Sequence, residues 1–477
     1  MSITNHLKTI AAIATPRGVG GVAMIRISGD DAVGIAARVF RAASGASVTE
    51  LEPRTAVYGV IFDAETFEKG ENNSEPCKID DGILTLFRAP NSYTGEDVAE
   101  ITCHGGIYVT ERVLRACLDA GASLAGAGEF TRRSLQNGKM SLTQAESVID
   151  IINSQNRQYL SYCMAQRDGA LYRKIEEISQ IILDITVQIA AWIDYPDELA
   201  EPDKPGLDSY ETGSFLGQLA NCRARLQLLI EGFEVGRVMR EGVLTAIVGK
   251  PNAGKSTIMN LLAHNQRSIV TEIAGTTRDI VEESVNLGDV ILRLCDCAGL
   301  RESGDEVEQI GVEIMLKRLE QCELALAVFD NSRPLEKEDY ALLEKLKGKN
   351  AICVINKADL ENQLDLTFLA TQFKNAIEIS AKDPASFEPL AAVIAKSLKL
   401  GRVDISAGFL ANERQREAAV LASRRLNSAI NGIDSGISLD ILGITLESAL
   451  TALYELSGKS VTDTVIDEVF RRFCVGK

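Results

Sequence analysis

The sequence lacks several features that would assign it to a class at once. No apolar run approaches the ~20 residues that a membrane-spanning helix needs, and the first residues show no long hydrophobic stretch of the kind found in export signals. The ten cysteines form no Cys-x-x-Cys pair, so we expect reduced thiols rather than a metal site or a disulfide framework. Internal repeats and low-complexity segments are missing as well. These absences predict a cytoplasmic protein that does not associate with membranes.

Positive charge is also scarce. The 477 residues include 50 Lys and Arg against 67 Asp and Glu, which gives a formal net charge of −17. Domains dedicated to nucleic acids are usually basic, so this balance argues against nonspecific binding to nucleic acid, although it does not exclude a local basic patch. The length predicts roughly two to four domains.

Residue periodicity divides the chain into four segments. Residues 1–140 alternate strand-like and helical runs, residues 141–241 are almost entirely helical in period, residues 242–400 show the strand–helix alternation of a parallel sheet, and residues 401–477 are helical again. Neither helical segment is convincing as a domain alone. We therefore predict one discontinuous helical domain with an α/β domain inserted into it. Strands are expected at 9–14, 22–27, 55–62, 82–87, 99–103, 244–248, 291–295, 324–329, 351–355 and 376–379.

A glycine-rich turn opens the α/β segment. Gly249-Lys250-Pro251-Asn252-Ala253-Gly254-Lys255-Ser256 fits the pattern G-x-x-x-x-G-K-S. It follows an apolar strand and precedes a helical run that begins near Thr257, which a chance glycine turn would not do. Backbone N–H groups at such a helix start bind phosphate. Lys255 is expected to reach the β and γ phosphates, and Ser256 to ligate Mg²⁺.

Two further motifs are typical of loops that respond to the γ-phosphate. Gly275-Thr276-Thr277-Arg278-Asp279 offers a threonine as the second side-chain ligand of Mg²⁺. Asp296-Cys297-Ala298-Gly299 follows a predicted strand, where the aspartate can hold the metal through water and the Gly299 N–H can contact the γ-phosphate. Each motif is weak alone, and both gain weight from their order after the phosphate loop.

The base is read by the last two motifs. Asn356-Lys357-Ala358-Asp359 follows a predicted strand, and the Asp359 carboxylate can accept two hydrogen bonds that guanine donates and adenine does not. Lys357 can cover the ring, and Ser380-Ala381-Lys382 can support it. The five motifs in this order predict a GTP-binding protein rather than an ATP-binding one.

Hydrolysis needs a group that orients the attacking water. Many GTPases use a glutamine after the Asp-x-x-Gly motif, but Leu300 stands at that position. The next loop contains several acids, one of which can orient water while the others are expected to be solvated; they are Glu302, Asp305, Glu306 and Glu308. Asn252 offers an oxygen that can bind a monovalent cation beside the phosphates.

Motifs outside the GTPase segment are more specific. They are Ala14-Thr15-Pro16, Ile25-Arg26-Ile27-Ser28-Gly29, Pro90-Asn91-Ser92-Tyr93-Thr94-Gly95-Glu96-Asp97, Cys103-His104-Gly105-Gly106, Gly128-Glu129-Phe130-Thr131 and the terminal Cys474-Val475-Gly476-Lys477. With the inserted GTPase segment, they make essentially the whole chain resemble the MnmE (TrmE) family of tRNA-modification GTPases. One departure is Cys297, where the family usually has threonine.

The resemblance implies a fold and a reaction. The fold is an N-terminal α+β tetrahydrofolate-binding domain, a discontinuous helical domain and an inserted Ras-like P-loop GTPase domain. The protein would be a homodimer held by its N-terminal domains and would form a heterotetramer with the flavoprotein MnmG, which carries FAD. Together they would add a carboxymethylaminomethyl or aminomethyl group at C5 of the wobble uridine of certain tRNAs, with a one-carbon unit from 5-formyltetrahydrofolate or a related tetrahydrofolate. GTP hydrolysis would depend on K⁺ and on dimerisation of the GTPase domains.

The resemblance also implies residue roles. Lys255 and Glu308 would be catalytic, Mg²⁺ would meet Ser256 and Thr277, and Glu308 would orient the water. K⁺ would meet Asn252, Thr271, Ile273 and Thr276. Folate would meet Arg26, Glu100, Lys139 and Lys477. The whole GTP-binding set would be Asn252, Ala253, Gly254, Lys255, Ser256, Thr257, Thr271, Glu272, Ile273, Ala274, Gly275, Thr276, Thr277, Asp296, Cys297, Ala298, Gly299, Asn356, Lys357, Asp359, Ser380, Ala381 and Lys382.

Simpler interpretations stay open at this point. Arg26 and Glu100 can form a structural ion pair, Lys139 and Lys477 can be surface lysines, and Cys474 can be an idle thiol rather than a reactive one. A ribosome-assembly GTPase would share the five GTP motifs, although the sequence shows no basic, aromatic RNA-binding module. A GTP-gated scaffold with low turnover would fit Leu300 but not Glu308 and Asn252.

Overall fold

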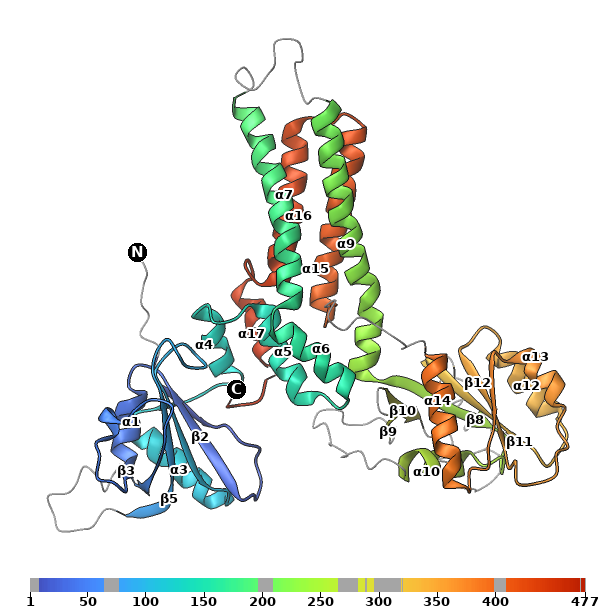
Figure 1. Cartoon of the computed structure of the whole chain (residues 1–477), viewed down its shortest axis with the longest axis horizontal. Helices are drawn as coiled ribbons and strands as arrows, with labels where there is room; N and C mark the ends of the chain where they lie inside the picture. The colour runs from blue at the N-terminus through green and yellow to red at the C-terminus, as the bar shows by residue number, and fades with distance from the viewer. Residues whose placement is uncertain are drawn as a thin grey trace. The chain divides into compact units, whose positions relative to one another are not determined.

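The computed structural model describes residues 8–63, 77–195, 209–264, 282–287, 290–295, 319, 321–398, 409–471 and 473–476. The chain divides into two compact units, each considered separately below. Unit 1 contains the described residues of Met1–Ile149, Arg167–Gln188 and Leu446–Lys477, and unit 2 contains those of Asp150–Gln166 and Ile189–Thr445. Helices α5 (Leu142–Asn153), α7 (Ala170–Asp194) and α16 (Leu439–Ser457) each contain residues of both units. Figure 1 labels these helices.

A seven-stranded sheet forms the centre of unit 1, with strand order β3-β4-β5-β6-β2-β1-β7. All neighbouring strands are antiparallel except β1 and β7, which run parallel. The strands are β1 (Ile10–Ile13), β2 (Val22–Ser28), β3 (Phe40–Ala42), β4 (Ala56–Phe62), β5 (Lys78–Phe87), β6 (Val98–His104) and β7 (Ser123–Leu124).

The two faces of this sheet differ because side chains alternate along each strand. On one face, the buried Ile25, Ile27 and Ile101 pack in the same core as residues of α1 (Ala32–Val39) and α3 (Ile107–Asp119). The opposite face presents Arg26 of β2 beside Glu100 of β6, which are direct cross-strand neighbours. The remaining short elements of this region are the 3₁₀ turn η1 (Val48–Glu50) and helix α4 (Glu129–Gln136).

Residues from the two ends of the sequence meet within unit 1. Helix α17 (Asp463–Arg471) and the residues after it place Phe470 and Phe473 in one apolar cluster with Ala145 of α5. Gly128 adopts φ +64°, and an added Cβ there would lie 2.8 Å from the Phe470 ring, so only glycine fits without a shift. The chain beyond α17 therefore packs directly against the turn that leads into α4.

A six-stranded sheet organises the nucleotide-binding part of unit 2, with order β13-β12-β11-β8-β10-β9. All pairs are parallel except β9 with β10, which is antiparallel. The strands are β8 (Val243–Gly249), β9 (Glu282–Asn286), β10 (Ile291–Cys295), β11 (Leu324–Asp330), β12 (Ala351–Asn356) and β13 (Asn375–Glu378). Every residue of β11 is buried, as expected for a central strand of a parallel sheet.

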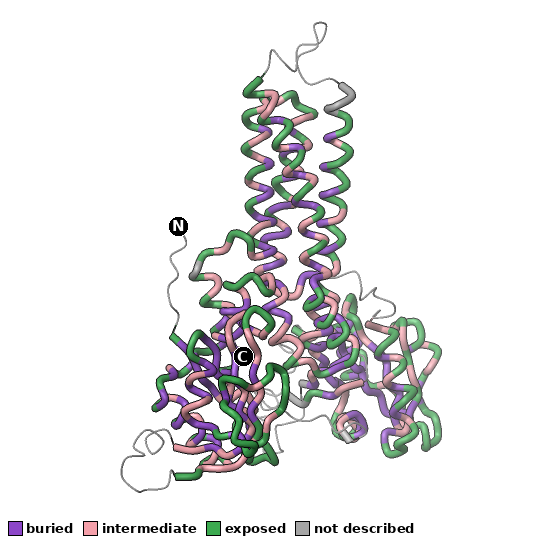
Figure 2. Tube along the Cα trace, turned by 60° about the vertical axis from the view of Figure 1, so that its left-hand side comes forward, coloured by how far each residue is buried: buried purple, intermediate pink, exposed green. Residues whose placement is uncertain are grey.

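Helices cover both faces of this sheet. Side chains of α10 (Lys255–His264) and α14 (Phe387–Ser397) share one core with the sheet, and those of α12 (Lys337–Leu346) and α13 (Leu366–Gln372) share the other. The 3₁₀ turn η2 (Pro384–Ser386) leads into α14. Figure 2 shows buried positions concentrated in the sheet strands and recurring at intervals along the long helices. This is the three-layer arrangement of a doubly wound α/β domain.

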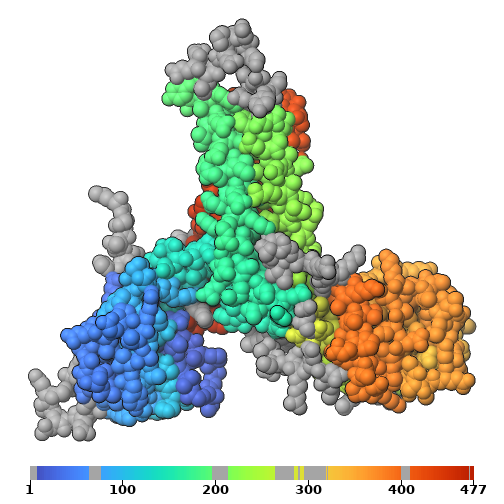
Figure 3. Space-filling view, in the orientation of Figure 1, coloured from blue at the N-terminus to red at the C-terminus, as the bar shows by residue number. Residues whose placement is uncertain are grey.

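Helical segments from both sides of the sheet come together within unit 2. Helix α9 (Ser209–Glu241), which precedes β8, packs along α15 (Glu413–Asp434), which follows α14 in sequence. Helix α6 (Arg157–Arg167) joins them through Tyr162, whose ring stacks on Phe409 at 4.3 Å between centroids and whose hydroxyl donates to the Phe409 carbonyl. In Figure 3 these helices have different colours, because the colour follows residue number and the three helices are far apart in the sequence.

The predicted fold class is confirmed: a mixed α/β N-terminal region, discontinuous helices and an inserted P-loop α/β sheet. All ten expected strands are present, with ends that differ by a few residues. Helix α9 extends to Glu241, and buried side chains continue along it to Met239. The four segment boundaries stay a prediction. None of the helices in the described residues is long and apolar enough to cross a membrane.

Candidate functional site

The predicted nucleotide motifs that the structure describes gather at one edge of the parallel sheet in unit 2. Gly249 ends β8, Asp330 ends β11 and Asn356 ends β12, and these three strands are hydrogen-bonded neighbours. Ligands of open α/β sheets bind outside the carboxyl ends of the strands. The sheet therefore brings the phosphate loop and the base-reading loop to the same edge, although about a hundred residues separate them in sequence.

The phosphate loop, residues 250–254, connects β8 to α10. Gly254 adopts φ +97°, and an added Cβ would lie 2.0 Å from the Asn356 amide nitrogen, so no side chain fits there. The Lys255 Nζ donates to the carbonyl oxygens of Gly249 at 2.9 Å and Lys250 at 2.8 Å. These bonds hold the loop against the Lys255 side chain. Ser256 and Thr257 follow in the first turn of α10, where free N–H groups favour an anion.

Asn356 joins the phosphate loop to the base-reading loops. Its Nδ2 donates to the Ala253 carbonyl at 2.8 Å, and its Oδ1 accepts from the Ala381 N–H at 2.9 Å. Asn356 is only 3% exposed, and both partner residues are buried. One amide side chain thus fixes the spacing of three predicted motifs.

The residues predicted to read the base lie beside this bridge. Lys357 adopts φ +64° and directs its Nζ to the Asp330 carboxylate at 2.5 Å. Asp359 is exposed, and hydrogen bonds from the Ser380 hydroxyl and its own backbone N–H lower the pKa of its carboxyl below the usual value. An ionised Asp359 is an acceptor at neutral pH, as the reading of guanine requires. Lys382 is exposed next to the buried Ala381.

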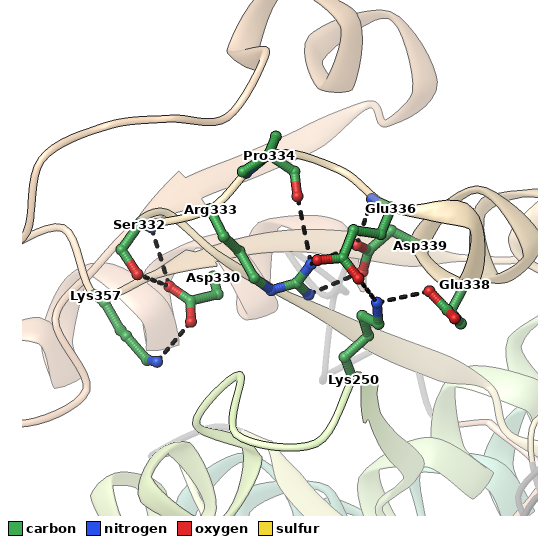
Figure 4. Close-up of polar contacts among 9 residues, drawn as sticks. All are labelled: Lys250, Asp330, Ser332, Arg333, Pro334, Glu336, Glu338, Asp339 and Lys357. Carbon is green, nitrogen blue, oxygen red and sulfur yellow. Dashed lines mark hydrogen bonds and ion pairs between the residues drawn. The ribbon is translucent and has the colours of Figure 1, made fainter.

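A second set of charges anchors the outer side of the phosphate loop (Figure 4). The Lys250 Nζ contacts Glu336 at 2.5 Å and Glu338 at 2.6 Å, at the start of α12. These carboxylates raise the pKa of the Lys250 amine, with Glu336 the larger cause. Beside them, Arg333 pairs with the buried Asp339 at 2.8 Å. Lys250 therefore pairs with the start of α12, whereas the Lys255 Nζ is bonded to carbonyl oxygens of the phosphate loop itself.

Several predicted site residues lie outside the described residues, so their roles stay predictions. They are Thr271, Glu272, Ile273, Ala274, Gly275, Thr276, Thr277, Asp296, Cys297, Ala298, Gly299, Glu308 and Lys477. Among the described residues, Asn252 is the predicted K⁺ ligand; it is exposed and adopts φ +61° in the phosphate loop.

Two of the predicted folate residues, Arg26 and Glu100, lie side by side on the face of the unit 1 sheet opposite to α1 and α3. Arg26 and Glu100 form an ion pair, with Nη2 to Oε1 at 2.8 Å and Nε to Oε1 also at 2.8 Å. Their side chains are 13% and 19% exposed, so both keep some access to solvent. The Arg26 guanidinium also lies 5.5 Å from the Tyr93 ring centroid and 5.7 Å from that of Phe130. The site combines both signs of charge with two aromatic rings, which suits a ligand that has a planar ring system and charged ends.

Lys139 lies on the other side of the loop that holds Tyr93. Its Nζ donates to the Pro90 carbonyl at 2.8 Å, and its stem packs beside Gly95. The Tyr93 carbonyl accepts from the Ser134 hydroxyl at 2.8 Å, and the Tyr93 hydroxyl lies 2.8 Å from that of Thr131. Helix α4 therefore holds this loop in place over Arg26, and Lys139 contacts the loop rather than the ion pair.

The segment before Lys477 approaches the same region from the side. Val475 forms an antiparallel bridge with Ala127, and the Gly128 N–H donates to the Cys474 carbonyl at 3.3 Å. An added Cβ at Gly476 would lie 2.2 Å from the Ile13 carbonyl of β1. Since Ala12 of β1 is the cross-strand neighbour of Arg26, the residues up to Gly476 lie beside the predicted folate site. The Cys474 side chain is exposed.

Sequence reasoning missed several residues that shape both sites. Asp330 contacts Lys357, Asn331 contacts Leu360, and Ser332 holds the Asp330 carboxylate. A signal was available, because a polar run follows the apolar strand at the sheet edge that binds ligands. In unit 1, the buried Arg133 pairs with Glu96 at 3.0 Å and Glu129 at 2.9 Å. Only its place four residues after Glu129 on a helix hinted at that contact.

Two protein-family models match the chain. Residues 9–139 match the model described as "GTP-binding protein TrmE N-terminus", and residues 142–474 match that described as "MnmE helical domain". The second match encloses the whole α/β sheet of unit 2.

Curated relatives match over almost their full length. The tRNA modification GTPase MnmE of Levilactobacillus brevis is 38% identical over 478 residues, which cover 99% of this chain and 99% of that protein. The protein of the same name from Thermoanaerobacter pseudethanolicus is 38% identical over 472 residues, which cover 98% of this chain and 99% of that protein. The likeness thus extends over both units and is not confined to the nucleotide site.

Solved structures match a smaller part. An Aquifex aeolicus Era variant bound to GDP.AlF4- is 26% identical, with a TM-score of 0.27, over 38% of this chain and 66% of that one. The G domain of the T. maritima FeoB iron transporter is 22% identical, with a TM-score of 0.25, over 34% of this chain and 99% of that one. Assignment to a family rests on the family models and the full-length relatives.

Proposed function

Because the chain belongs to the MnmE family, we propose that it is a GTP-hydrolysing enzyme that takes part in the modification of tRNA. The proposal has three functional parts: residues 1–140 for folate binding and dimerisation, residues 141–241 together with 401–477 for the helical domain, and residues 242–400 for the GTPase domain. It places the protein in the cytoplasm.

The GTPase part binds GTP at the carboxyl edge of the sheet. Lys255 and the N–H groups at the start of α10 neutralise phosphate charge, while Ser256 and Thr277 hold Mg²⁺ and Asp296 supports it through water. Asp359 accepts hydrogen bonds from guanine, Lys357 covers the ring, and the Ser380 to Lys382 segment supports it. Phosphoryl transfer depends on position and charge more than on covalent help from the protein, and the Asn356 bridge supports that role because it fixes the phosphate loop relative to the base loop.

Two residues complete hydrolysis in this proposal. Asn252, with Thr271, Ile273 and Thr276, holds a potassium ion that offsets charge developing on the phosphates as two GTPase domains associate. Glu308 orients the attacking water, since Leu300 is apolar. The side-chain oxygen of Asn252 and its exposed place in the phosphate loop support the first role.

The N-terminal part binds a reduced folate in this proposal. Arg26 and Glu100 would hold its polar groups between the rings of Tyr93 and Phe130, and Lys139 and Lys477 would contact its charged end. The bound folate supplies a one-carbon unit. The half-buried ion pair, the two rings and the nearby residues 473–476 support this assignment.

We further propose that two copies of the chain work with the FAD-carrying protein MnmG as a heterotetramer. In this complex the two proteins together add a carboxymethylaminomethyl or aminomethyl group at C5 of the wobble uridine of certain tRNAs. The full-length similarity to proteins named tRNA modification GTPase MnmE supports this substrate.

The observation that carries the proposal is the full-length family match together with the joined nucleotide motifs on one sheet edge. The test is mass spectrometry of tRNA nucleosides from cells that lack the protein, with and without the wild-type chain or its Lys255→Ala variant. We expect loss of the C5-modified wobble uridine, restored by the wild type only. Normal modification in the deletion strain would refute the role in tRNA, and copurification of ribosomal RNA instead of tRNA would favour a ribosome-assembly GTPase.

A further inference from the structure

A short polar segment outside the five nucleotide motifs contacts the base-reading loop. Asp330, the last residue of β11, lies beside Lys357, and Ser332 lies against the Asp330 carboxylate (Figure 4). Asn331 stands between Asp330 and Ser332 in the sequence. Asp330 and Asn331 are 7% and 4% exposed. Polar residues this well buried need hydrogen-bond partners. Asp330 finds them in Lys357 and Ser332, and Asn331 finds one in Leu360.

The Asp330 carboxylate divides its two oxygens between different tasks. Oδ1 accepts from the Ser332 backbone N–H at 3.0 Å and the Ser332 hydroxyl at 2.7 Å, which fixes the carboxylate in a tight turn. Oδ2 accepts from the Lys357 Nζ at 2.5 Å. Burial opposes ionisation of Asp330, but the hydrogen bonds from Lys357 and Ser332 outweigh it and lower the pKa of the carboxyl. The acceptor for Lys357 is therefore charged and rigid.

Asn331 holds the backbone on either side of Lys357. Its N–H donates to the Asn356 carbonyl at 2.9 Å, and its Nδ2 donates to the Leu360 carbonyl at 3.3 Å. The Gln363 N–H in turn donates to the Asn331 carbonyl at 2.8 Å. The loop that contains Lys357 is thus fixed at both ends, and Asp330 fixes the one long side chain between them.

We propose that Asp330 is a positioning residue that holds the Lys357 side chain where the guanine ring binds, and so sets the affinity for GTP and GDP. This inference rests on the proposed GTP site. A free lysine side chain loses considerable rotamer entropy when a ligand immobilises it. Asp330 orders Lys357 before the nucleotide arrives, so less of the binding free energy is lost in ordering it.

The position of the pair predicts which step is affected. Lys357 belongs to the base-reading motif, whereas hydrolysis takes place at the γ-phosphate. GTP and GDP have the same base, so both should lose affinity equally when the pair is broken. The rate of hydrolysis at saturating GTP should stay unchanged, because the Asp330 carboxylate bonds Lys357 and Ser332, on the side of the site where the base is expected.

The test compares the full-length wild type with Asp330→Asn. The variant keeps an oxygen for Ser332 but replaces the charged acceptor of Lys357. The lysine is 31% exposed, so the effect should lie at the low end for a charge-assisted bond, with dissociation constants for fluorescent GDP and a GTP analogue about tenfold higher. The matched control is Asp365→Asn, which removes one charge from the same domain. Asn is an equally good helix cap at this position, the start of α13, so affinity should be unchanged.

A double-mutant cycle separates positioning from a general structural role. If Asp330 acts through Lys357, Asp330→Asn should have no further effect in a Lys357→Ala background. An additive loss there, a lower rate at saturating GTP, or unchanged affinity in the single variant would overturn the inference. A wild-type protein that binds no guanine nucleotide would instead refute the proposed GTP site.

Discussion

Replacing Asn356 with alanine is expected to separate the phosphate loop from the base-reading loops in one step. The amide donates to the Ala253 carbonyl at 2.8 Å and accepts from the Ala381 N–H at 2.9 Å. Alanine makes neither bond. Because Ala253 and Ala381 are 1% and 6% exposed, water cannot readily replace the lost partner.

The expected magnitude follows from those two bonds. A buried group left without its partner costs about 1–3 kcal/mol. Taking a low value of about 1.4 kcal/mol for each, the nucleotide-ready arrangement loses about 2.8 kcal/mol, which corresponds to about 100-fold weaker binding of GTP and GDP.

Binding can be measured as nucleotide-dependent stabilisation of the full-length protein. At a GDP concentration 100 times the wild-type Kd, the wild type should gain about 2.7 kcal/mol of stability, and a variant with a 100-fold higher Kd only about 0.4 kcal/mol. Fluorescence titration with a labelled GDP gives the Kd independently. Circular dichroism without nucleotide shows whether the variant is folded at the assay temperature.

Asn350→Ala provides a matched control. Asn350 lies just before the other end of β12 and is exposed, and its side-chain oxygen accepts from the Ser397 hydroxyl at 2.9 Å. This variant should bind GDP as the wild type does. Wild-type affinity in a folded Asn356→Ala protein, or equal losses in both variants, would refute the reasoning that the Asn356 bridge organises the site.

Four further predictions test the proposed sites. Asp359→Asn should weaken GTP binding at least about 100-fold, because the asparagine NH₂ group would face one of the two guanine N–H donors that the carboxylate accepts. Unchanged affinity in a titration would exclude this residue from base reading. GTP turnover should be much faster in K⁺ than in Na⁺, and Asn252→Ala should remove the difference while affinity is mostly kept; equal rates in both salts for the wild type would count against the cation site. Glu308→Ala should slow single-turnover hydrolysis by at least about tenfold, on the low side of typical losses for such groups, whereas Glu306→Ala should not; equal behaviour of the two variants would show that Glu308 is an ordinary solvated acid. Deletion of residues 474–477 should reduce tRNA modification but not GTP hydrolysis, and normal tRNA modification in the truncated protein would leave the terminal motif without a role.

Much of the nucleotide-binding fold could be predicted because its signals are local. The apolar run of β11 and the glycine pattern before Lys255 each fix an element without reference to distant residues. Short or polar elements escaped for the same reason. β3 has three residues and β7 two, too few for a period, and β9 is a polar edge strand whose pairing with β10 comes from tertiary contacts.

The geometry of the site was less predictable than the identity of the residues that form it. Sequence spacing cannot show that Asn356 reaches Ala253, because the contact depends on how neighbouring strands stack in the sheet. The Asp330–Lys357 pair and the contacts of aromatic rings with Arg26 also depend on tertiary packing that spacing in the sequence does not reveal. The Arg26–Glu100 pair is intermediate, since two charges in strand-like segments suggested a partner but not the strand register that joins them.

The packing of residues 463–476 against the turn before α4 also has a consequence for how the protein is made. The cluster of Phe470 and Phe473 with Ala145, and the bridge of Val475 with Ala127, join sequence that the ribosome synthesises early to sequence that it synthesises after all the intervening helices and the nucleotide-binding sheet. Domains generally fold in order of synthesis. Unit 1 therefore cannot complete its packing until residues 463–476 are synthesised, and its Ala127–Gly128 turn stays uncovered while unit 2 emerges and folds. The side of the sheet next to Arg26 is completed only at the end of translation, so a nascent chain could complete its nucleotide-binding sheet before the proposed folate site.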